Sequence, residues 1–112
     1  MAKPLNRAYS RYGIEALNLL AQRIRAGRIS RKISEQEMAS RAGISRSLLQ
    51  RIEKGDPGGA IGAVFEVAAI AGVPLFDADQ KRLQTERAIT GEVLSLLPKR
   101  VRRPKRTVKD DF

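Results

Sequence analysis

The chain contains neither cysteine nor histidine. Without thiols it has no disulfide framework, and without thiolate and imidazole groups it lacks the usual zinc ligands and the commonest nucleophiles and general bases. We therefore predict no catalytic residues, no metal site and no bound cofactor. These absences favour a binding protein over an enzyme.

Aromatic residues and long apolar runs are also scarce. The sequence has no tryptophan, two tyrosines and three phenylalanines among 112 residues, so aliphatic side chains must build the core, as in small helical bundles. A hydrophobic fraction of 42% is enough for one small domain. The longest strongly apolar run, residues 60–76, is interrupted by glycine, glutamate and proline and is too short to span a membrane. Residues 1–13 lack the apolar core of a signal peptide, so we expect a cytoplasmic protein.

Negative charge is in the minority. Twelve acidic residues stand against 22 lysines and arginines, which gives a formal net charge of +10. A chain this basic favours a polyanionic partner. Nucleic acid is the first candidate, and an anionic membrane surface is the second.

The segment SEQEMASRAGISRSLLQRIEKG, residues 34–55, predicts two short helices joined by a tight turn. Ser34 and Glu37 form a capping-box pattern, so the first helix should begin at Glu35 and end at Gly43. The two glutamates of its first turn are expected to serve the cap and the helix dipole. Ser45 should cap a second helix, which a further glycine ends.

The second helix, residues 46–54, divides into two arcs at 100° per residue. Leu48, Leu49 and Ile52 form a core arc, while the other arc carries Arg46, Ser47, Gln50, Arg51 and Lys54. A capped helix, a glycine turn and a second amphipathic helix are typical of a helix-turn-helix, whose second helix enters the major groove of DNA. An ordinary helical hairpin is the alternative.

A long helix is predicted before this segment. It should begin at Tyr9 or Ser10 and end at Gly27, and its apolar face consists of Ile14, Leu17, Leu20, Ala21 and Ile24. Three cations follow, which are expected either to contact phosphate or to stay solvated: Arg28, Arg31 and Lys32.

Two further helices are predicted after the turn at residues 56–59. Residues 60–71 are apolar almost all round, which is typical of a central helix or of a helix shared with a second subunit. Residues 73–76 should be extended, and Asp77 or Asp79 should cap a last helix that ends near residue 97. The apolar second half of this helix could form a dimer contact or pack back onto its own domain.

The motif in residues 34–55 resembles the Cro and lambda-repressor type of helix-turn-helix, the XRE family, and the resemblance extends over residues 20–72. The stretches GDPGGAIGAVFEVAAIAGVPLF and YSRYGIEAL are similar to a narrower group, the HipB-like antitoxins encoded beside HipA-like serine/threonine kinases. This resemblance implies an all-α, lambda-repressor-like fold of about five helices. It also implies a homodimer, a palindromic double-stranded DNA operator and, for the narrower group, a kinase toxin as partner.

The resemblance also implies roles for single residues. Arg46 and Ser47 would meet base edges first, and Gln50 and Arg51 would follow along the groove. The expected phosphate-binding residues are Ser34, Gln36, Ser45, Lys54, Arg31 and Lys32. The chain departs from the family at Leu48, where a threonine is frequent, and a leucine could instead meet a thymine methyl group.

We therefore expect a helix-turn-helix DNA-binding domain at residues 9–76, a C-terminal helix at residues 77–97 and a flexible basic tail at residues 98–112. The tail holds seven of the 22 cations and ends in Phe112, which could anchor a protein partner such as the kinase or belong to a silent, solubilising end. The leading hypothesis for function is an autorepressing DNA-binding antitoxin. The alternatives are a phage-type or stand-alone regulator without a toxin, and an RNA- or ribosome-associated basic protein.

Overall fold

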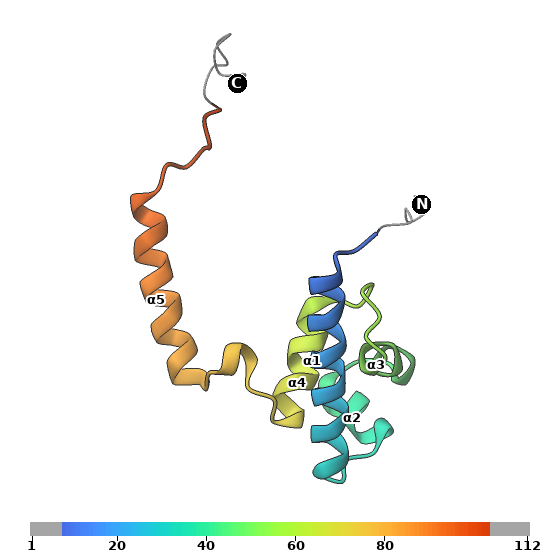
Figure 1. The fold of residues 1–112 in the computed structure, drawn as a ribbon. Helices are drawn as coiled ribbons and strands as arrows, with labels where there is room; N and C mark the ends of the chain where they lie inside the picture. Colours follow the sequence, from blue (N-terminus) through green and yellow to red (C-terminus); the bar gives the residue numbers. More distant parts are fainter. Residues whose placement is uncertain (1–7, 104–112) are drawn as a thin grey trace. The chain divides into compact units, whose positions relative to one another are not determined.

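A computed structural model describes residues 8–103 of the chain. Over this range it contains five α-helices, one 3-10 turn and no strand, so the predicted all-α class is confirmed (Figure 1). The elements are α1 (Arg11–Ser30), α2 (Glu35–Ala42), α3 (Arg46–Glu53), α4 (Ile61–Ala71), η1 (Leu75–Asp77) and α5 (Gln80–Leu96). The chain divides into two units between Asp77 and Ala78.

Serine side chains set the starts of the first three helices. The Oγ atoms of Ser10, Ser34 and Ser45 each accept a hydrogen bond of 3.0 Å from a backbone N–H three residues later. Each bond satisfies one of the amide donors that a helix start leaves free. The predicted starts of α2 and α3 are therefore confirmed. The reciprocal hydrogen bond of the capping box, from the Ser34 amide to the Glu37 carboxylate, does not form. Oε2 of Glu37 instead lies 3.6 Å from Nη1 of Arg41.

Gly43 ends α2 with a φ of 71°, as predicted, because a left-handed backbone is accessible to glycine without steric cost. Gly27, by contrast, does not end α1, and that prediction is wrong. Gly27 lies against α4, where a Cβ atom would collide with the carbonyl oxygen of Ala71. The residue is thus a packing glycine, and α1 continues for three more residues to Ser30.

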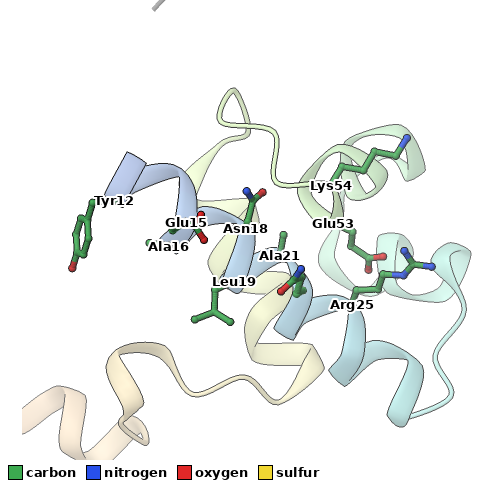
Figure 2. A pocket seen from close by; sticks show the side chains of 10 residues that line it. Tyr12, Glu15, Ala16, Asn18, Leu19, Ala21, Arg25, Glu53 and Lys54 are labelled. Carbon is green, nitrogen blue, oxygen red and sulfur yellow. The ribbon is translucent and has the colours of Figure 1, made fainter. Parts of the chain in front are cut away.

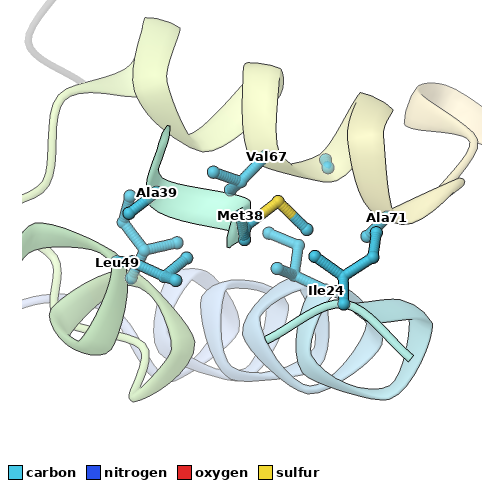
Figure 3. Packing of buried hydrophobic residues seen from close by; sticks show 9 residues of the cluster. Ile24, Met38, Ala39, Leu49, Val67 and Ala71 are labelled. Atoms are coloured by element: carbon cyan, nitrogen blue, oxygen red, sulfur yellow. The ribbon is translucent and has the colours of Figure 1, made fainter. Parts of the chain in front are cut away.

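Helices α1 to α4 enclose one aliphatic core (Figure 3). Its largest fully buried side chains, Ile24, Met38, Leu49 and Val67, come one from each helix. Helix α4 contacts both α1 and α2, and it buries Val67 with two of its alanines. The second half of α4 therefore takes the central position, which is one of the two alternatives predicted for this helix, although Ile61 at its start is exposed.

The segment after α4 differs from the extended conformation predicted for residues 73–76. Residues Leu75–Asp77 form a 3-10 turn, in which Phe76 and Asp77 have φ values of 55° and 51°. Phe76 is 82% exposed. It lines an apolar surface cavity of about 350 Å³ with Leu19, Phe65 and neighbouring residues of the first unit.

In the second unit, Asp79 caps α5 by accepting a 2.8 Å hydrogen bond from the N–H of Arg82. The helix has no buried residue, and the apolar side chains of its second half are exposed. Residues 98–103 of the tail contain no helix or strand. The rest of the tail, including Phe112, lies outside the described residues. Among the helices of residues 8–103, none is long and apolar enough to cross a membrane.

Candidate nucleic-acid interface

Helix α3 separates its polar and apolar side chains as its sequence predicts. Leu49 and Ile52 are buried, and Leu48 packs partly against the same core. The four predicted base-reading residues are all exposed: Arg46, Ser47, Gln50 and Arg51. The helix therefore presents a polar edge that the core does not occupy.

Glu35, the first residue of α2, connects α2 to this polar edge. Its Oε1 atom accepts hydrogen bonds of 3.4 Å and 3.3 Å from Nε and Nη2 of Arg46. The same oxygen accepts a 3.1 Å hydrogen bond from Nε2 of Gln50. The start of α2 and the polar edge of α3 consequently belong to one surface. Sequence reasoning assigned Glu35 only to the helix start and missed these contacts.

The electrostatics of Glu35 follow from these partners. The hydrogen bond from Gln50, followed by the hydrogen bond and charge of Arg46, lowers the pKa of the Glu35 carboxyl below its ordinary value. The group is therefore ionised at neutral pH. An ionised carboxylate only accepts hydrogen bonds, so both partners must present N–H groups to it.

Two of the predicted phosphate-binding residues are capping serines. The Oγ atoms of Ser34 and Ser45 accept backbone N–H groups, which leaves each hydroxyl hydrogen available to donate. Gln36, in the first turn of α2, is exposed beside them. The starts of α2 and α3 also carry the partial positive charge of a helix N-terminus, which favours anions.

Arg51 has a partner in the loop that follows α3. Its Nε atom lies 3.1 Å from Oδ2 of Asp56, whose Oδ1 accepts a 2.8 Å hydrogen bond from the N–H of Gly58. The Gly58 amide, followed by Arg51, lowers the pKa of Asp56. Arg51 is thus tied to this loop, whereas Arg46 and Gln50 are tied to α2.

Lys54 is exposed at the opposite end of α3 from Arg46. The intervening eight-residue helix is about 12 Å long at 1.5 Å per residue. Lys54 lines an open surface cavity of about 870 Å³ formed by one side of α1 and the end of α3 (Figure 2). Glu53 lies on the same cavity wall, together with Asn18 and Arg25 of α1.

Arg28 neither stays solvated nor is free to contact phosphate, so both expectations for it are wrong. Its side chain is buried, and it forms a two-point ion pair with Glu53: Nε to Oε2 at 2.7 Å and Nη2 to Oε1 at 3.0 Å. Its Nη1 atom also donates to the carbonyl oxygen of Ile33. Arg28 lies four residues after Ile24 on the apolar face of α1, and this spacing is the signal that could have identified it.

The two cations after Arg28 have different surroundings. Arg31 donates a 2.9 Å hydrogen bond from Nη1 to the carbonyl oxygen of Ile70, near the end of α4. Lys32 is exposed and has a φ of 58°, which turns the chain between α1 and α2. Within the described part of the chain, neither residue forms a hydrogen bond or ion pair with Arg46 or Gln50.

A comparison with protein families adds a finding that agrees with this geometry. A family model described as Helix-turn-helix matches residues 24–75, from the buried Ile24 of α1 to Leu75 of η1. A comparison with curated proteins gives no significant match to the chain. The match covers the last part of α1 together with α2, α3 and α4, and it leaves α5 outside.

Proposed function

We propose that this chain, whose residues 24–75 form a helix-turn-helix domain of the XRE family, is a sequence-specific DNA-binding repressor of transcription. One observation carries the proposal. Helix α3 buries Leu49 and Ile52 and leaves Arg46, Ser47 and Gln50 exposed along the edge that Glu35 joins to α2. This edge is the part of a helix-turn-helix that enters the major groove.

The proposed mechanism has two parts. Phosphate contacts supply affinity without sequence information, and base-edge contacts supply discrimination. The hydroxyls of Ser34 and Ser45 and the amide of Gln36 support the first part, because they flank the helix starts with free donors. Arg31, Lys32 and Lys54 remain proposed phosphate contacts on the strength of their exposed positive charge.

Arg46 supports the second part because it stands at the exposed start of α3. We predict that Arg46→Ala weakens binding to the cognate duplex by about 1 to 3 kcal/mol and changes binding to random duplex much less. Fluorescence anisotropy with DNA from upstream of the protein's own gene and with scrambled DNA measures both. Arg41→Ala is the matched control, since it removes the same charge from α2. Equal losses on the two duplexes would contradict the base-reading role.

We propose that the repressor is a homodimer on a palindromic operator, because one helix-turn-helix covers only one half-site. The proposed dimer contact consists of the exposed side chains of Ile89 and Val93, which lie four residues apart on α5, and of Leu97, which directly follows the helix. Val93→Glu should convert the dimer to a monomer in light scattering. A wild-type protein that is monomeric at micromolar concentration, free and on DNA, would contradict the proposal.

A narrower proposal is that the protein is a HipB-like antitoxin that represses its own operon and binds a HipA-like kinase toxin. The support is the similarity of residues 9–17 and 55–76 to that group. Co-expression with a kinase encoded next to its gene, followed by affinity purification, tests this proposal. A stand-alone XRE regulator without a toxin partner is the alternative, and failure of the pair to copurify would favour it.

A further inference from the structure

The contact between Glu35 and Arg46 uses one particular edge of the guanidinium group. A guanidinium presents two donor edges, one formed by Nε and Nη2 and the other by Nη1 and Nη2. Glu35 accepts from Nε and Nη2, so it occupies the first edge. The second edge keeps its two parallel N–H groups free at the exposed end of the side chain. Such a pair of parallel donors matches two adjacent acceptors.

Glu35 fixes the amide of Gln50 in a similar way. Nε2 of Gln50 donates one hydrogen to Oε1 of Glu35 over 3.1 Å. The reversed amide would place a carbonyl oxygen against an ionised carboxylate, where neither atom can donate, so this orientation is the stable one. The second Nε2 hydrogen and the amide oxygen therefore remain free. Gln50 presents one donor and one acceptor side by side.

We propose that Glu35 is a positioning residue that sets the base preference of α3, so that Arg46 reads a guanine and Gln50 reads an adenine. The inference rests on the proposed function, which makes α3 the base-reading helix. Guanine offers O6 and N7 as paired acceptors in the major groove, which suits the free edge of Arg46. Adenine offers the N7 acceptor and the N6 donor, which suits the free groups of Gln50.

The spacing of the two residues sets the spacing of the two bases. Arg46 and Gln50 are four residues apart, so their Cβ atoms are about 5 to 6 Å apart along one face of α3. Base pairs follow one another at about 3.4 Å along the duplex. The bound DNA should therefore carry the guanine and the adenine within about two base pairs of each other.

The charge of Glu35 adds discrimination against other sequences. The ionised Glu35 carboxylate repels phosphate on any sequence, and on DNA that lacks the guanine no base offers the paired acceptors that match the free edge of Arg46. On the matching site, Arg46 donates its free edge to the base while its other edge keeps the carboxylate contact. Glu35 thus weakens non-specific binding more than specific binding.

Glu37 provides a matched control for Glu35. Both are glutamates in the first turn of α2, and both favour the helix dipole. The carboxylate of Glu37 lies 3.6 Å from Arg41 of the same helix and makes no hydrogen bond to α3. A difference between variants of the two residues therefore reports the contact with α3 and not the loss of a charge near the helix start.

The test is a selection of binding sites from a random-sequence duplex library with the full-length protein. The wild type should enrich a guanine and an adenine within two base pairs, each preferred by roughly 5- to 150-fold. Arg46→Ala should lose only the guanine preference, and Gln50→Ala only the adenine preference. Glu35→Ala should reduce both preferences to below about 5-fold, whereas Glu37→Ala keeps them. Circular dichroism checks that each variant is folded. If Glu35→Ala does not fold, Glu35→Gln is tested in its place.

The outcomes separate the inference from the proposed function. A wild type that enriches no sequence, or arginine and glutamine variants that select the wild-type site, would refute base reading by α3. If Arg46→Ala and Gln50→Ala each lose their base but Glu35→Ala selects the same site as Glu37→Ala, only the positioning role is overturned. A selection in which other bases replace guanine and adenine would overturn the assigned pairing.

Discussion

The buried ion pair between Arg28 and Glu53 allows a sharp test of what holds the four-helix core together. The two side chains are 9% and 6% exposed, and two hydrogen bonds join them. Glu53→Gln keeps the size of the side chain and removes its charge, which leaves the Arg28 guanidinium buried without a counter-ion. Breaking such a pair costs roughly 3 to 5 kcal/mol. We expect about 3 kcal/mol, because the amide oxygen can still accept one hydrogen bond.

The assay is urea unfolding followed by circular dichroism, with thermal unfolding as a second measurement. A loss of about 3 kcal/mol corresponds to a fall in Tm of about 12 °C or more for a domain of this size. Glu37→Gln, which breaks an exposed pair with Arg41, should cost less than about 1 kcal/mol. If Glu53→Gln and Glu37→Gln shift the urea midpoint equally, the reasoning from burial is wrong.

The double variant Arg28→Met with Glu53→Leu separates the charge from the packing. It removes both charges and keeps apolar volume, so much of the lost stability should return. The recovery should be incomplete, since the carbonyl oxygen of Ile33 loses the donor that Arg28 provides, at a cost of about 1 kcal/mol. If the double variant is no more stable than Glu53→Gln, the unpaired charge of Arg28 is not the main cause of the lost stability.

Two further predictions concern glycine packing and acid stability. Gly27→Ala should destabilise the fold by about 1 to 3 kcal/mol in urea unfolding, because the added Cβ atom meets α4. Gly91 has open space around it, so Gly91→Ala should stabilise α5 by about 0.5 to 1 kcal/mol. Equal effects of the two substitutions would contradict the packing role of Gly27. The pKa of Asp56 is lowered below 3.8 in the folded chain, so its stabilising contribution is present above that pH and is lost as the pH falls through the lowered value. Asp56→Asn should therefore flatten the decline of the urea midpoint in acid, and an unchanged pH profile would contradict this assignment.

Most helix boundaries could be predicted because they depend on local chemistry. The caps at Ser34 and Ser45 and the glycine stop at Gly43 each satisfy backbone groups within four residues of the chain. The boundary at Gly27 could not be predicted in this way. A glycine near the end of an apolar pattern can stop a helix or can admit a neighbouring helix, and only the position of α4 decides between the two.

The surroundings of the charged residues were harder to predict than the helices. Arg28, Arg31 and Lys32 lie within one five-residue stretch, and the sequence gives them the same two options. In the fold, Arg28 enters the core to meet Glu53, and Arg31 reaches the carbonyl oxygen of Ile70, 39 residues away. Partners so distant in sequence leave no local signal, although the apolar face of α1 does extend to Arg28.

Glu35 and Glu37 show the same limit at the candidate interface. Sequence reasoning gives the two glutamates one shared role, because both stand in the first turn of α2 and both favour its dipole. Two residues along a helix amount to a rotation of 200°, so the two carboxylates point to different sides. Glu37 faces Arg41 of its own helix. Glu35 faces α3, where its Oε1 atom accepts hydrogen bonds from both Arg46 and Gln50. The turn between α2 and α3 determines which of the two glutamates faces α3. It thereby places a negative charge among the residues proposed to read DNA.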